Sequence, residues 1–382
     1  MTWKEFIKYG YENQCEIACL KGANDPAVIL YSGGTSGDPK GILLTNMNFN
    51  ALALSCHKMI EQSGEGESIL AILPIFHGFG LGVCIHTTLG CGMRVVLVPN
   101  FNPKDFGKLL HKHKISIVCG VPSLFESLTK TSMGKNDLSK LKSAISGGDF
   151  MSKDLKNKVD TYFREHGSNA EIWVGYGLTE ASAAICVTPT GEYRESSIGV
   201  PFPDTYIKVV RVGTHDEVPY GEDGEICISG PTVMMGYLNN LEETIQTLQI
   251  HEDGRTWLHT GDVGSMDKDG FVYFKQRVKR IIISNGYNLY PSYIETIINS
   301  HPDVFTSTVI GIPHPKKVQV AKAYIVLKDG VKPSKDVEKS IRLHCEKNLA
   351  RYSLPAVYEF RESLPKTLVG KVAYRELEKE SK

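Results

Sequence analysis

Short apolar runs alternate with helix-patterned segments over the first half of the chain. Four of these runs end in turn residues and predict buried strands, at residues 27–32, 68–76, 93–99 and 115–122. Residues 45–60 and 103–114 carry apolar side chains at helical spacing, and Thr45 or Asn46 is a suitable N-cap for the first of these helices. Strands that alternate with helices in this way indicate a parallel sheet covered on both faces.

The pattern changes from about residue 198 onwards. Shorter, alternating, turn-rich segments predict antiparallel sheet, and the Asp-Lys-Asp-Gly turn at 267–270 predicts a hairpin. A second pattern of strands and helices follows it, with helices expected at 291–299 and 334–350. We therefore expect an α/β protein: a large domain with parallel sheets, helices and a small antiparallel part, then a small α+β domain of normal size.

Composition limits the classes of function. The chain has 382 residues, 41% hydrophobic and 23% charged, which is typical of a globular protein. Lys plus Arg equals Asp plus Glu at 43 each, so net charge gives no reason to expect a nucleic-acid or anionic-membrane partner. We see no signal sequence and no apolar run of membrane-spanning length, which predicts a cytoplasmic protein with no transmembrane segment.

Cysteine and histidine spacing argues against a metal site. The nine cysteines are scattered and form no CxxC pair, so we expect reduced, packed thiols. The run His111-Lys112-His113 places two imidazoles at i and i+2, which point apart on a helix. A solvated helix face is the interpretation that this spacing favours.

The stretch YSGGTSGDPKG at 31–41 has the composition of a phosphate-binding loop. Its glycines allow close approach of the backbone, its hydroxyls and N–H groups donate hydrogen bonds, and Lys40 adds positive charge. Lys40 lies between Pro39 and Gly41, so the stretch does not fit the Walker pattern of kinases and GTPases. A flexible surface loop rich in glycine and serine is the alternative.

Further blocks follow in a fixed order: LPIFHGFGL (73–81), SGGD (146–149), GYGLTEAS (175–182), WLHTGDVG (257–264), KQRVKRIIISNGYNLYP (275–291) and LPKTLVGKVAYREL (364–377). Together with residues 31–41 they resemble the AMP-binding, adenylate-forming superfamily of acyl-CoA synthetases, luciferases and peptide-synthetase adenylation domains. The resemblance extends from about Ala27 to Leu377, and it is greatest to medium- and long-chain acyl-CoA synthetases.

The resemblance implies roles for the first blocks. The loop residues that would bind phosphate are Ser32, Gly33, Thr35, Ser36, Gly37 and Lys40. His77 would gate the acyl pocket, and Gly147 and Gly148 would leave room for substrate beside adenine. Asp149 replaces the small or apolar residue usual there. Without the resemblance, His77 would be interpreted as a packed core histidine and 146–149 as an ordinary turn.

The next blocks would hold the nucleotide. Tyr176 and Gly177 would lie against adenine, Thr179 would offer a hydroxyl to phosphate, and Glu180 would hold Mg²⁺, which needs few carboxylates. Asp262 could accept two hydrogen bonds from the paired hydroxyls of a ribose. Taken alone, Thr179-Glu180 would be a helix N-cap followed by a first-turn acid, and Thr-Gly-Asp would be a turn.

The last blocks describe a domain junction and a catalytic lysine. Arg277 would contact ribose or phosphate, Lys279 would be the hinge, and Gly286 would line the pantetheine channel; Asn285 stands where Ser is usual. The expected boundaries are 1–276, a hinge at 277–279, and a lid at 280–382. Lys371 would be the cation that offsets repulsion between a substrate carboxylate and the α-phosphate.

The function that the resemblance implies is activation of a carboxylic acid, of the fatty-acid class, by ATP and Mg²⁺. The products would be acyl-AMP and pyrophosphate, and the acyl group would then pass to CoA. Transfer to the thiol of a separate carrier protein is an alternative.

A third reading follows from length. Family members carry about one more domain's length, ~100 residues or more, before the phosphate loop, which here begins at residue 31. We therefore expect the large domain to lack its usual first segment. The apolar face left behind would be covered by a partner chain, by a second copy in a homo-oligomer, or not at all. A nucleotide-binding but catalytically impaired short form is the corresponding alternative function.

Overall fold

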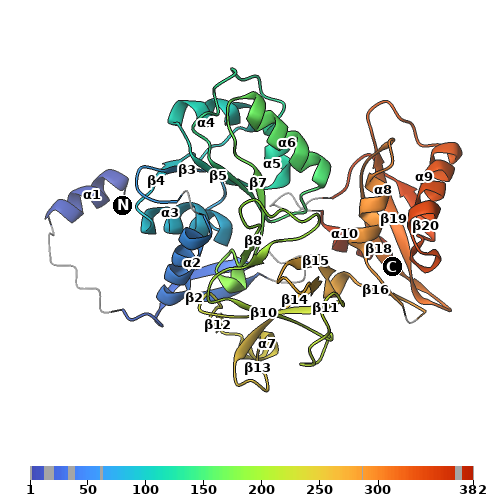
Figure 1. Ribbon diagram of the computed structural model, residues 1–382. Coiled ribbons are helices and arrows are strands. Elements are labelled where there is room, and N and C mark those ends of the chain that lie inside the picture. The colour runs from blue at the N-terminus through green and yellow to red at the C-terminus, as the bar shows by residue number, and fades with distance from the viewer. Residues whose placement is uncertain are drawn as a thin grey trace.

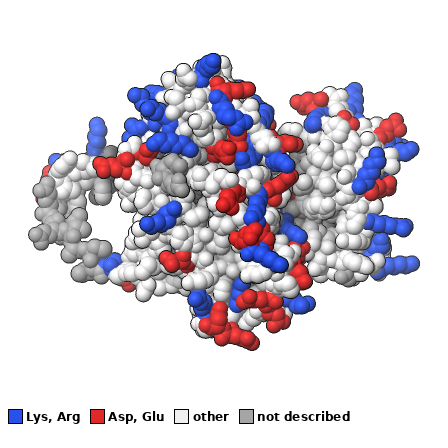
Figure 2. Space-filling model, in the orientation of Figure 1, with Lys and Arg blue, Asp and Glu red and all other residues white. Residues whose placement is uncertain are grey.

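A computed structural model describes residues 2–12, 21–32, 39–60, 63–285, 287–365 and 372–381 of the protein. Figure 1 shows a central sheet with helices above it, antiparallel strands below it, and a C-terminal unit at the right. Both signs of charge occur over the face drawn in Figure 2, as the equal numbers of acidic and basic residues lead one to expect. No helix in the described part of the chain has the length and apolar character needed to cross a membrane.

The central sheet has seven strands in the order β4-β3-β5-β6-β7-β8-β9. Its strands are β3 (Ser68–Ala71), β4 (Arg94–Leu97), β5 (Ile117–Gly120), β6 (Ser143–Ser146), β7 (Ile172–Tyr176), β8 (Cys186–Val187) and β9 (Val200–Pro201). The first five in spatial order are parallel, whereas β8 and β9 pair antiparallel. The predicted parallel sheet is confirmed, although its strands are shorter than the apolar runs.

Both faces of this sheet are buried, because successive apolar side chains point to opposite sides. Leu70, Val118 and Ala144 pack on one side against α4 (Phe106–His113), α5 (Pro122–Leu128) and α6 (Lys153–Glu165). Ile69, Ile117 and Ile145 pack on the other side against α2 (Asn46–Met59) and the π-helix η1 (Phe79–Thr87). The described cysteines are free thiols, and six of those seven are buried.

The N-terminal region differs from the expected order of strand, loop and helix. Strand β1 (Pro26–Ser32) pairs antiparallel with β2 (Lys40–Thr45), which pairs in turn with β12 (Gly236–Tyr237). The glycine-rich stretch therefore lies between two strands of a hairpin. Strand β1 is not a buried strand, since Ile29 and Tyr31 are exposed. Thr45, and not Asn46, caps α2, and its hydroxyl accepts the N–H of Asn48 in a capping box.

The predicted antiparallel part is confirmed. Its strands are β10 (Tyr206–Val210), β11 (Gly224–Ser229), β13 (Leu248–Ile250), β14 (Thr256–Met266) and β15 (Val272–Arg277), with α7 (Leu241–Thr247) preceding β13. Strands β14 and β15 form the predicted hairpin, whose turn places Gly270 at a positive φ of 86°. Strand β14 is central to the site described below, because it pairs with β11, β13 and β15.

The C-terminal unit is the predicted α+β arrangement. Its strands are β16 (Ile282–Ser284), β17 (Tyr287–Leu289), β18 (Val304–His314), β19 (Val318–Leu327) and β20 (Val357–Phe360). Its helices are α8 (Pro291–Asn299), α9 (Lys335–Asn348) and α10 (Tyr374–Glu380). Helices α8 and α9 pack on the sheet through a core that includes Ile294, Ile341 and Ile325.

The remaining elements are short or peripheral. They are α1 (Trp3–Glu12), α3 (Thr88–Gly90), η2 (Pro103–Asp105), η3 (Thr179–Ala181), η4 (Val278–Arg280) and η5 (Arg351–Ser353). Helix α1 is the first element of the chain, and residues 13–20, which follow it, lie outside the described residues.

Candidate functional site

The polar residues singled out in the sequence gather where strands β6 and β7 end. Gly147 follows β6, and its N–H donates to the carbonyl of Gly120 at 3.0 Å. A Cβ on Gly147 would lie 3.2 Å from the carbonyl oxygen of Gly175 and 3.4 Å from the ring of Phe79. Gly148 has a positive φ of 79°, which side chains disfavour. A side chain is therefore disfavoured at both positions, at Gly147 by crowding against β7 and Phe79 and at Gly148 by the backbone conformation.

Gly177 makes the closest backbone approach in the site. A Cβ on this residue would lie 1.4 Å from the carbonyl oxygen of Ala183. The chain folds back here through η3, with Ser182 and Ala183 at positive φ. The hydroxyl of Ser182 holds the fold by donating to the carbonyl of Thr232 at 2.7 Å. The segment beginning at Thr179 is a single 3₁₀ turn, so the interpretation as an N-capped α-helix is wrong.

Asp262 joins three segments that are distant in sequence. The hydroxyl of Tyr176, at the end of β7, donates to its Oδ2. The guanidinium Nε of Arg277, at the end of β15, lies 2.7 Å from its Oδ1. The Asp262 side chain is only 1% exposed. A buried carboxylate is kept charged by hydrogen bonds and an opposite charge, so these two partners account for its burial.

The charges of these groups support one another. Burial, together with the negative charge of Asp262, raises the pKa of Tyr176 well above its usual value, so its hydroxyl stays protonated and donates. Burial acts to lower the pKa of Arg277, but the charges of Asp262 and Glu180 outweigh it and the pKa is raised. The positive charge of Arg277 is therefore close enough to interact with both Asp262 and Glu180.

The turn that carries Asp262 is an irregularity in a strand. Its N–H donates to the hydroxyl of Thr260 at 3.0 Å, and Gly261 has a positive φ of 68°. Glu225 on β11 accepts the N–H of Gly261 at 2.9 Å. The β11–β14 register shifts at this point, as expected of a bulge. The Thr-Gly-Asp sequence is thus a strand bulge that re-aims Asp262.

A second group forms around Glu180. The hydroxyl of Tyr237 donates to Glu180 Oε1 at 3.0 Å. The ammonium of Lys40 lies 5.1 Å from the centre of the Tyr237 ring and donates to Glu243 at the start of α7. Strand β12 makes this possible, because Tyr237 pairs with Ile42 on β2. The described end of the glycine-rich stretch, at Lys40, and Glu180 therefore lie on either side of Tyr237.

The glycine-rich stretch is closed by the β1–β2 hairpin. Ser32 and Lys40 are paired across it, so the chain returns opposite the point where it left. The intervening candidates Gly33, Thr35, Ser36 and Gly37 lie outside the described residues, as do the side chain of Ser32, Gly286 and Lys371.

His77 precedes the π-helix η1. Its side chain is exposed, and its Nδ1 accepts the N–H of Phe79 at 3.2 Å. The interpretation as a packed core histidine is therefore wrong. Short π-helical segments occur frequently at functional sites, and this one begins at Phe79, the residue whose ring faces Gly147.

The junction between the two units is held on both sides of Lys279. Buried Gln276 accepts the N–H of Ser292 at 3.2 Å. Arg280 contacts Glu295 at 2.5 Å, and its guanidinium lies 4.9 Å from the centre of the Tyr374 ring. Lys279 itself is exposed in the 3₁₀ turn η4. Fixed contacts therefore flank one exposed residue.

Four residues that contact the candidate site or the domain junction were not identified from the sequence. They are Tyr237, Glu243, Gln276 and Glu225. Tyr237 and Glu243 follow no recognisable motif, and each meets its partner only through long-range pairing. Gln276 lies next to Arg277 on β15, where successive side chains point to opposite faces. That alternation was the signal that could have predicted its burial.

Comparison with known proteins gives independent evidence. Residues 8–238 match the family model described as AMP-binding enzyme, and residues 293–371 match the AMP-binding enzyme C-terminal domain. The chain is 37% identical over 357 residues to a long-chain-fatty-acid–CoA ligase of Bacillus subtilis, a match that covers 93% of the chain and 61% of the ligase. It is 34% identical to a luciferin 4-monooxygenase of Nipponoluciola cruciata, over 91% of the chain and 62% of that protein.

Solved structures resemble it as well. ATP-bound MatB from Rhodopseudomonas palustris gives a TM-score of 0.85 at 27% identity, covering 94% of this chain and 69% of MatB. O-succinylbenzoate CoA synthetase of Bacillus subtilis with its acyl-adenylate intermediate gives 0.81 at 29% identity, over 93% and 69%. The chain spans 61–62% of the length of the two curated relatives named above. The family-model match covers more than half of the chain, which therefore belongs to the AMP-binding enzyme family.

Proposed function

We propose that the protein activates a carboxylic acid, of the fatty-acid class, with ATP to give acyl-AMP and pyrophosphate, and then transfers the acyl group to CoA. The observation that carries the proposal is the meeting of Tyr176, Asp262 and Arg277 beside Glu180. Together they offer a buried acceptor for hydroxyls, an aromatic face and a separate acid for a cation. The names of the relatives, long-chain-fatty-acid–CoA ligases, support the substrate class.

Each described residue has a task in nucleotide binding. The two oxygens of Asp262 would accept the ribose hydroxyls, with Arg277 and Tyr176 fixing the orientation of the carboxylate. Gly177 would let the turn at 177–183 lie flat beside adenine. Lys40, at the base of the glycine-rich stretch, would turn from Glu243 towards the leaving pyrophosphate, with Ser32, Gly33, Thr35, Ser36 and Gly37 donating from the stretch itself. Thr179 would donate its hydroxyl to phosphate.

The residues fit a magnesium ion bound together with ATP. Glu180 is half-buried and has one oxygen oriented by Tyr237, and Mg²⁺ is usually held by one or two carboxylates plus phosphate oxygens and water. When bound, the ion would neutralise phosphate charge. The structure of O-succinylbenzoate CoA synthetase of Bacillus subtilis in complex with ATP and a magnesium ion resembles this chain, at a TM-score of 0.82 and 28% identity.

The chemistry has two steps. A carboxylate oxygen attacks the α-phosphorus, the bond to the bridging oxygen breaks, and pyrophosphate leaves with the electron pair. The thiol of CoA then attacks the acyl carbonyl, the bond to AMP breaks, and the thiol proton passes to solvent. Lys371 would offset charge repulsion in the first step. His77, Gly147 and Gly148 would border the acyl group.

The two steps would use two positions of the C-terminal unit. We assign a large domain to 1–276, a hinge to 277–279 and a lid to 280–382. The contacts of Arg280 with Glu295 and Tyr374 lie within the lid and would stay with it. The contact between Gln276 and Ser292 crosses the hinge and would break as the backbone turns at Lys279. Such hinges absorb backbone rotation in a few residues. Rotation would withdraw Lys371 and bring Gly286 to the channel for CoA.

The deciding experiment separates the two steps. ATP–pyrophosphate exchange is measured with a panel of fatty acids, and thioester formation is measured from supplied acyl-AMP. Lys371→Ala should abolish exchange and largely spare thioester formation. Lys379→Ala on the exposed side of α10 is the matched control and should change neither rate. Equal loss of both steps in Lys371→Ala would contradict the assignment.

The same assay distinguishes the alternatives. Offering CoA and a carrier protein in parallel identifies the thiol acceptor, and preference for the carrier would overturn the CoA assignment. A folded protein that binds ATP but gives no exchange with any acid in the panel would instead support a nucleotide-binding role without catalysis.

A further inference from the structure

Three histidines from separate segments meet on the antiparallel sheet, and none of them is among the residues assigned above to the candidate nucleotide site. His215 lies in the loop after β10, His251 follows β13, and His259 lies on β14. Each offers a nitrogen within 4.8 Å of the others. Nε2 of His251 is 2.9 Å from Nε2 of His259, and the rings of His215 and His251 stack with centroids 4.0 Å apart.

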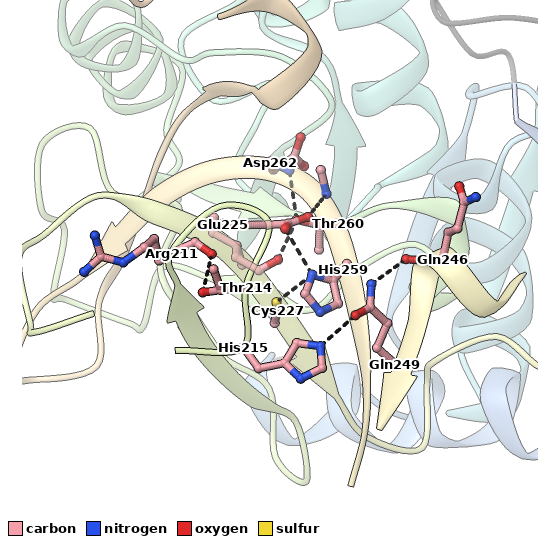
Figure 3. A network of polar contacts seen from close by, with 12 residues as sticks. Arg211, Thr214, His215, Glu225, Cys227, Gln246, Gln249, His259, Thr260 and Asp262 are labelled. Atoms are coloured by element: carbon pink, nitrogen blue, oxygen red, sulfur yellow. Dashed lines mark hydrogen bonds and ion pairs between the residues drawn. The ribbon is translucent and has the colours of Figure 1, made fainter. Parts of the chain in front are cut away.

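The outer partner of His259 decides which of its nitrogens is available. Its Nδ1–H donates to Glu225 Oε2 at 3.0 Å, as Figure 3 shows. The lone pair of its neutral form is then on Nε2, the atom that faces His251. A histidine that ligates a metal almost always donates its other N–H to a carboxylate or carbonyl in this way.

His215 is arranged by the same rule. The side-chain amide N–H of Gln249 donates to the carbonyl of Gln246 at 2.7 Å, which turns Gln249 Oε1 towards His215. Nε2–H of His215 then donates to Oε1 at 2.7 Å, and Nδ1 keeps the lone pair (Figure 3). In His215 and His259, therefore, one ring nitrogen donates its hydrogen to an acceptor outside the cluster, and the other ring nitrogen keeps its lone pair. His215 is exposed, so its ring has room to turn and ions have access from solvent.

His251 is the buried member, at 4% exposure. Its Nε2 is the nitrogen that faces His259, and its Nδ1 is buried without a hydrogen-bond partner among the described residues.

We propose that His215, His251 and His259 bind a divalent transition-metal ion of the Zn²⁺ class, with Glu225 and Gln249 orienting the imidazoles. Zn–N bonds of about 2.0–2.1 Å place tetrahedral nitrogens about 3.3 Å apart, close to the separation of His251 and His259. The remaining position faces solvent through His215 and would hold water. Imidazole suits Zn²⁺, Co²⁺ and Ni²⁺, whereas Mg²⁺ prefers oxygen ligands.

A second group, Glu225, Cys227 and His259, also lies within ligand distance. Here Cys227 Sγ is 3.6 Å from Nδ1 of His259, the nitrogen that already donates to Glu225. The three-histidine group is therefore the one we assign.

The ion would tie three segments to the turn that carries Asp262. Glu225 contacts His259 with one oxygen and the N–H of Gly261 with the other. Metal binding at His259 would thus stiffen the Thr260–Asp262 bulge through a single carboxylate. The expected role is structural, and its readout is metal binding and thermal stability rather than catalysis.

The test is a Co²⁺ titration of the full chain, stripped with chelator, without nucleotide and with excess Mg²⁺ present. We expect one equivalent of Co²⁺ with the visible absorption of four- or five-coordinate cobalt, displaced by Zn²⁺ and accompanied by a rise in Tm. His215→Ala should weaken binding by more than about a hundredfold, and Glu225→Gln by about 10–100-fold, the usual loss for an outer partner. His111→Ala, an exposed histidine on α4, is the control and should bind like the natural chain.

Several outcomes would overturn the proposal. They are the absence of visible absorption, displacement of Co²⁺ by Mg²⁺, and equal binding by His215→Ala and the natural chain. Loss of binding in Cys227→Ser would assign the metal to the other group and refute the ligand set. His215 is exposed, so its substitution should keep the metal-free Tm unchanged and the test does not depend on the fold of a buried variant.

Discussion

Asp262 and Glu180 are two acids of one candidate site, and they lie in different surroundings. Asp262 is fully buried on a strand, with Tyr176 contacting one oxygen and Arg277 the other. Glu180 is half-buried in a 3₁₀ turn, with Tyr237 contacting one oxygen. The first carboxylate is held and charge-balanced by the protein itself. Among the described residues, no lysine or arginine forms a hydrogen bond or an ion pair with the second.

The difference indicates different partners. A buried carboxylate of fixed orientation suits ligand hydroxyls, whose hydrogen bonds depend on direction. The carboxylate of Glu180 is half-exposed, and Arg277 interacts with it only through longer-range charge. Such a carboxylate suits a hydrated cation that keeps most of its water. The same chemical group thus serves orientation in one place and charge in the other, which the following substitutions test.

The largest effect is expected from Gly177→Ala, because Gly177 lies between Tyr176 and the turn that holds Glu180. The new methyl would overlap the carbonyl of Ala183, so the turn must move and both acids lose their partners. We expect a loss of about 3 kcal/mol or more in the free energy of unfolding, together with loss of ATP binding. Chemical denaturation and nucleotide titration measure the two.

Gly90→Ala is the matched control. A Cβ on Gly90 would make an ordinary contact of 3.6 Å with Ala53, at the end of a helix and without a positive φ. It should leave stability and ATP binding nearly unchanged. Equal behaviour of the two variants would show that the close approach at Gly177 is not essential.

Much of this site was accessible from the sequence, for a physical reason. Apolar runs report burial, so the parallel sheet and the helix at 291–299 follow from them directly. Pairing between distant segments leaves no such record: nothing in residues 40–45 indicates that they return along β1, and nothing around Tyr237 indicates that it meets Glu180. Asp262 was found through its block, whereas the bulge that aims it depends on Glu225, 37 residues earlier.

The next effect in size is expected from Asp262→Asn, which keeps the shape of the side chain and removes its charge. Hydrogen bonds to a charged acceptor contribute about 1.5–3 kcal/mol each. Asn keeps one acceptor oxygen, so the loss of one such bond to ribose and the weakening of the other should raise the KM for ATP by about a hundredfold. Asp267→Asn is the control, because it also removes a carboxylate charge and an ion pair, the one with Arg194 at 2.6 Å, but at the turn between β14 and β15. Its KM for ATP should be unchanged. An unchanged KM in Asp262→Asn would refute the ribose assignment.

Glu180→Gln tests the other acid and should act through the cation. Loss of one charged ligand, about 1.5–3 kcal/mol, should lower the rate of exchange about 10–100-fold at fixed Mg²⁺. The diagnostic result is a higher half-saturating Mg²⁺ concentration with metal-free ATP binding unchanged. Glu171→Gln, at the exposed residue before β7, should show neither change. The same Mg²⁺ dependence in Glu180→Gln and the natural chain would break the contrast between the two acids.

The smallest effect is expected from removing one hydroxyl beside each acid, in Tyr176→Phe and Tyr237→Phe. At pH 7 each should cost about 1 kcal/mol of stability, the net value of a hydrogen bond. Burial and the neighbouring carboxylate raise the pKa of both tyrosines above the unfolded value of about 10. The stabilising contribution is therefore complete below pH 10.

As pH rises above about 10, the unfolded tyrosine ionises while the folded one stays neutral, so unfolding gains up to about 1.4 kcal/mol per pH unit for each such group. Phenylalanine has no proton to lose. The stability advantage of tyrosine should thus shrink above pH 10 and then reverse, in denaturation curves measured from pH 8 to 11. Both folded tyrosines keep a pKa well above this range, so the curves for the two positions should bend alike. Parallel curves for the natural chain and Tyr176→Phe would show that the hydroxyl does not stay protonated beside Asp262.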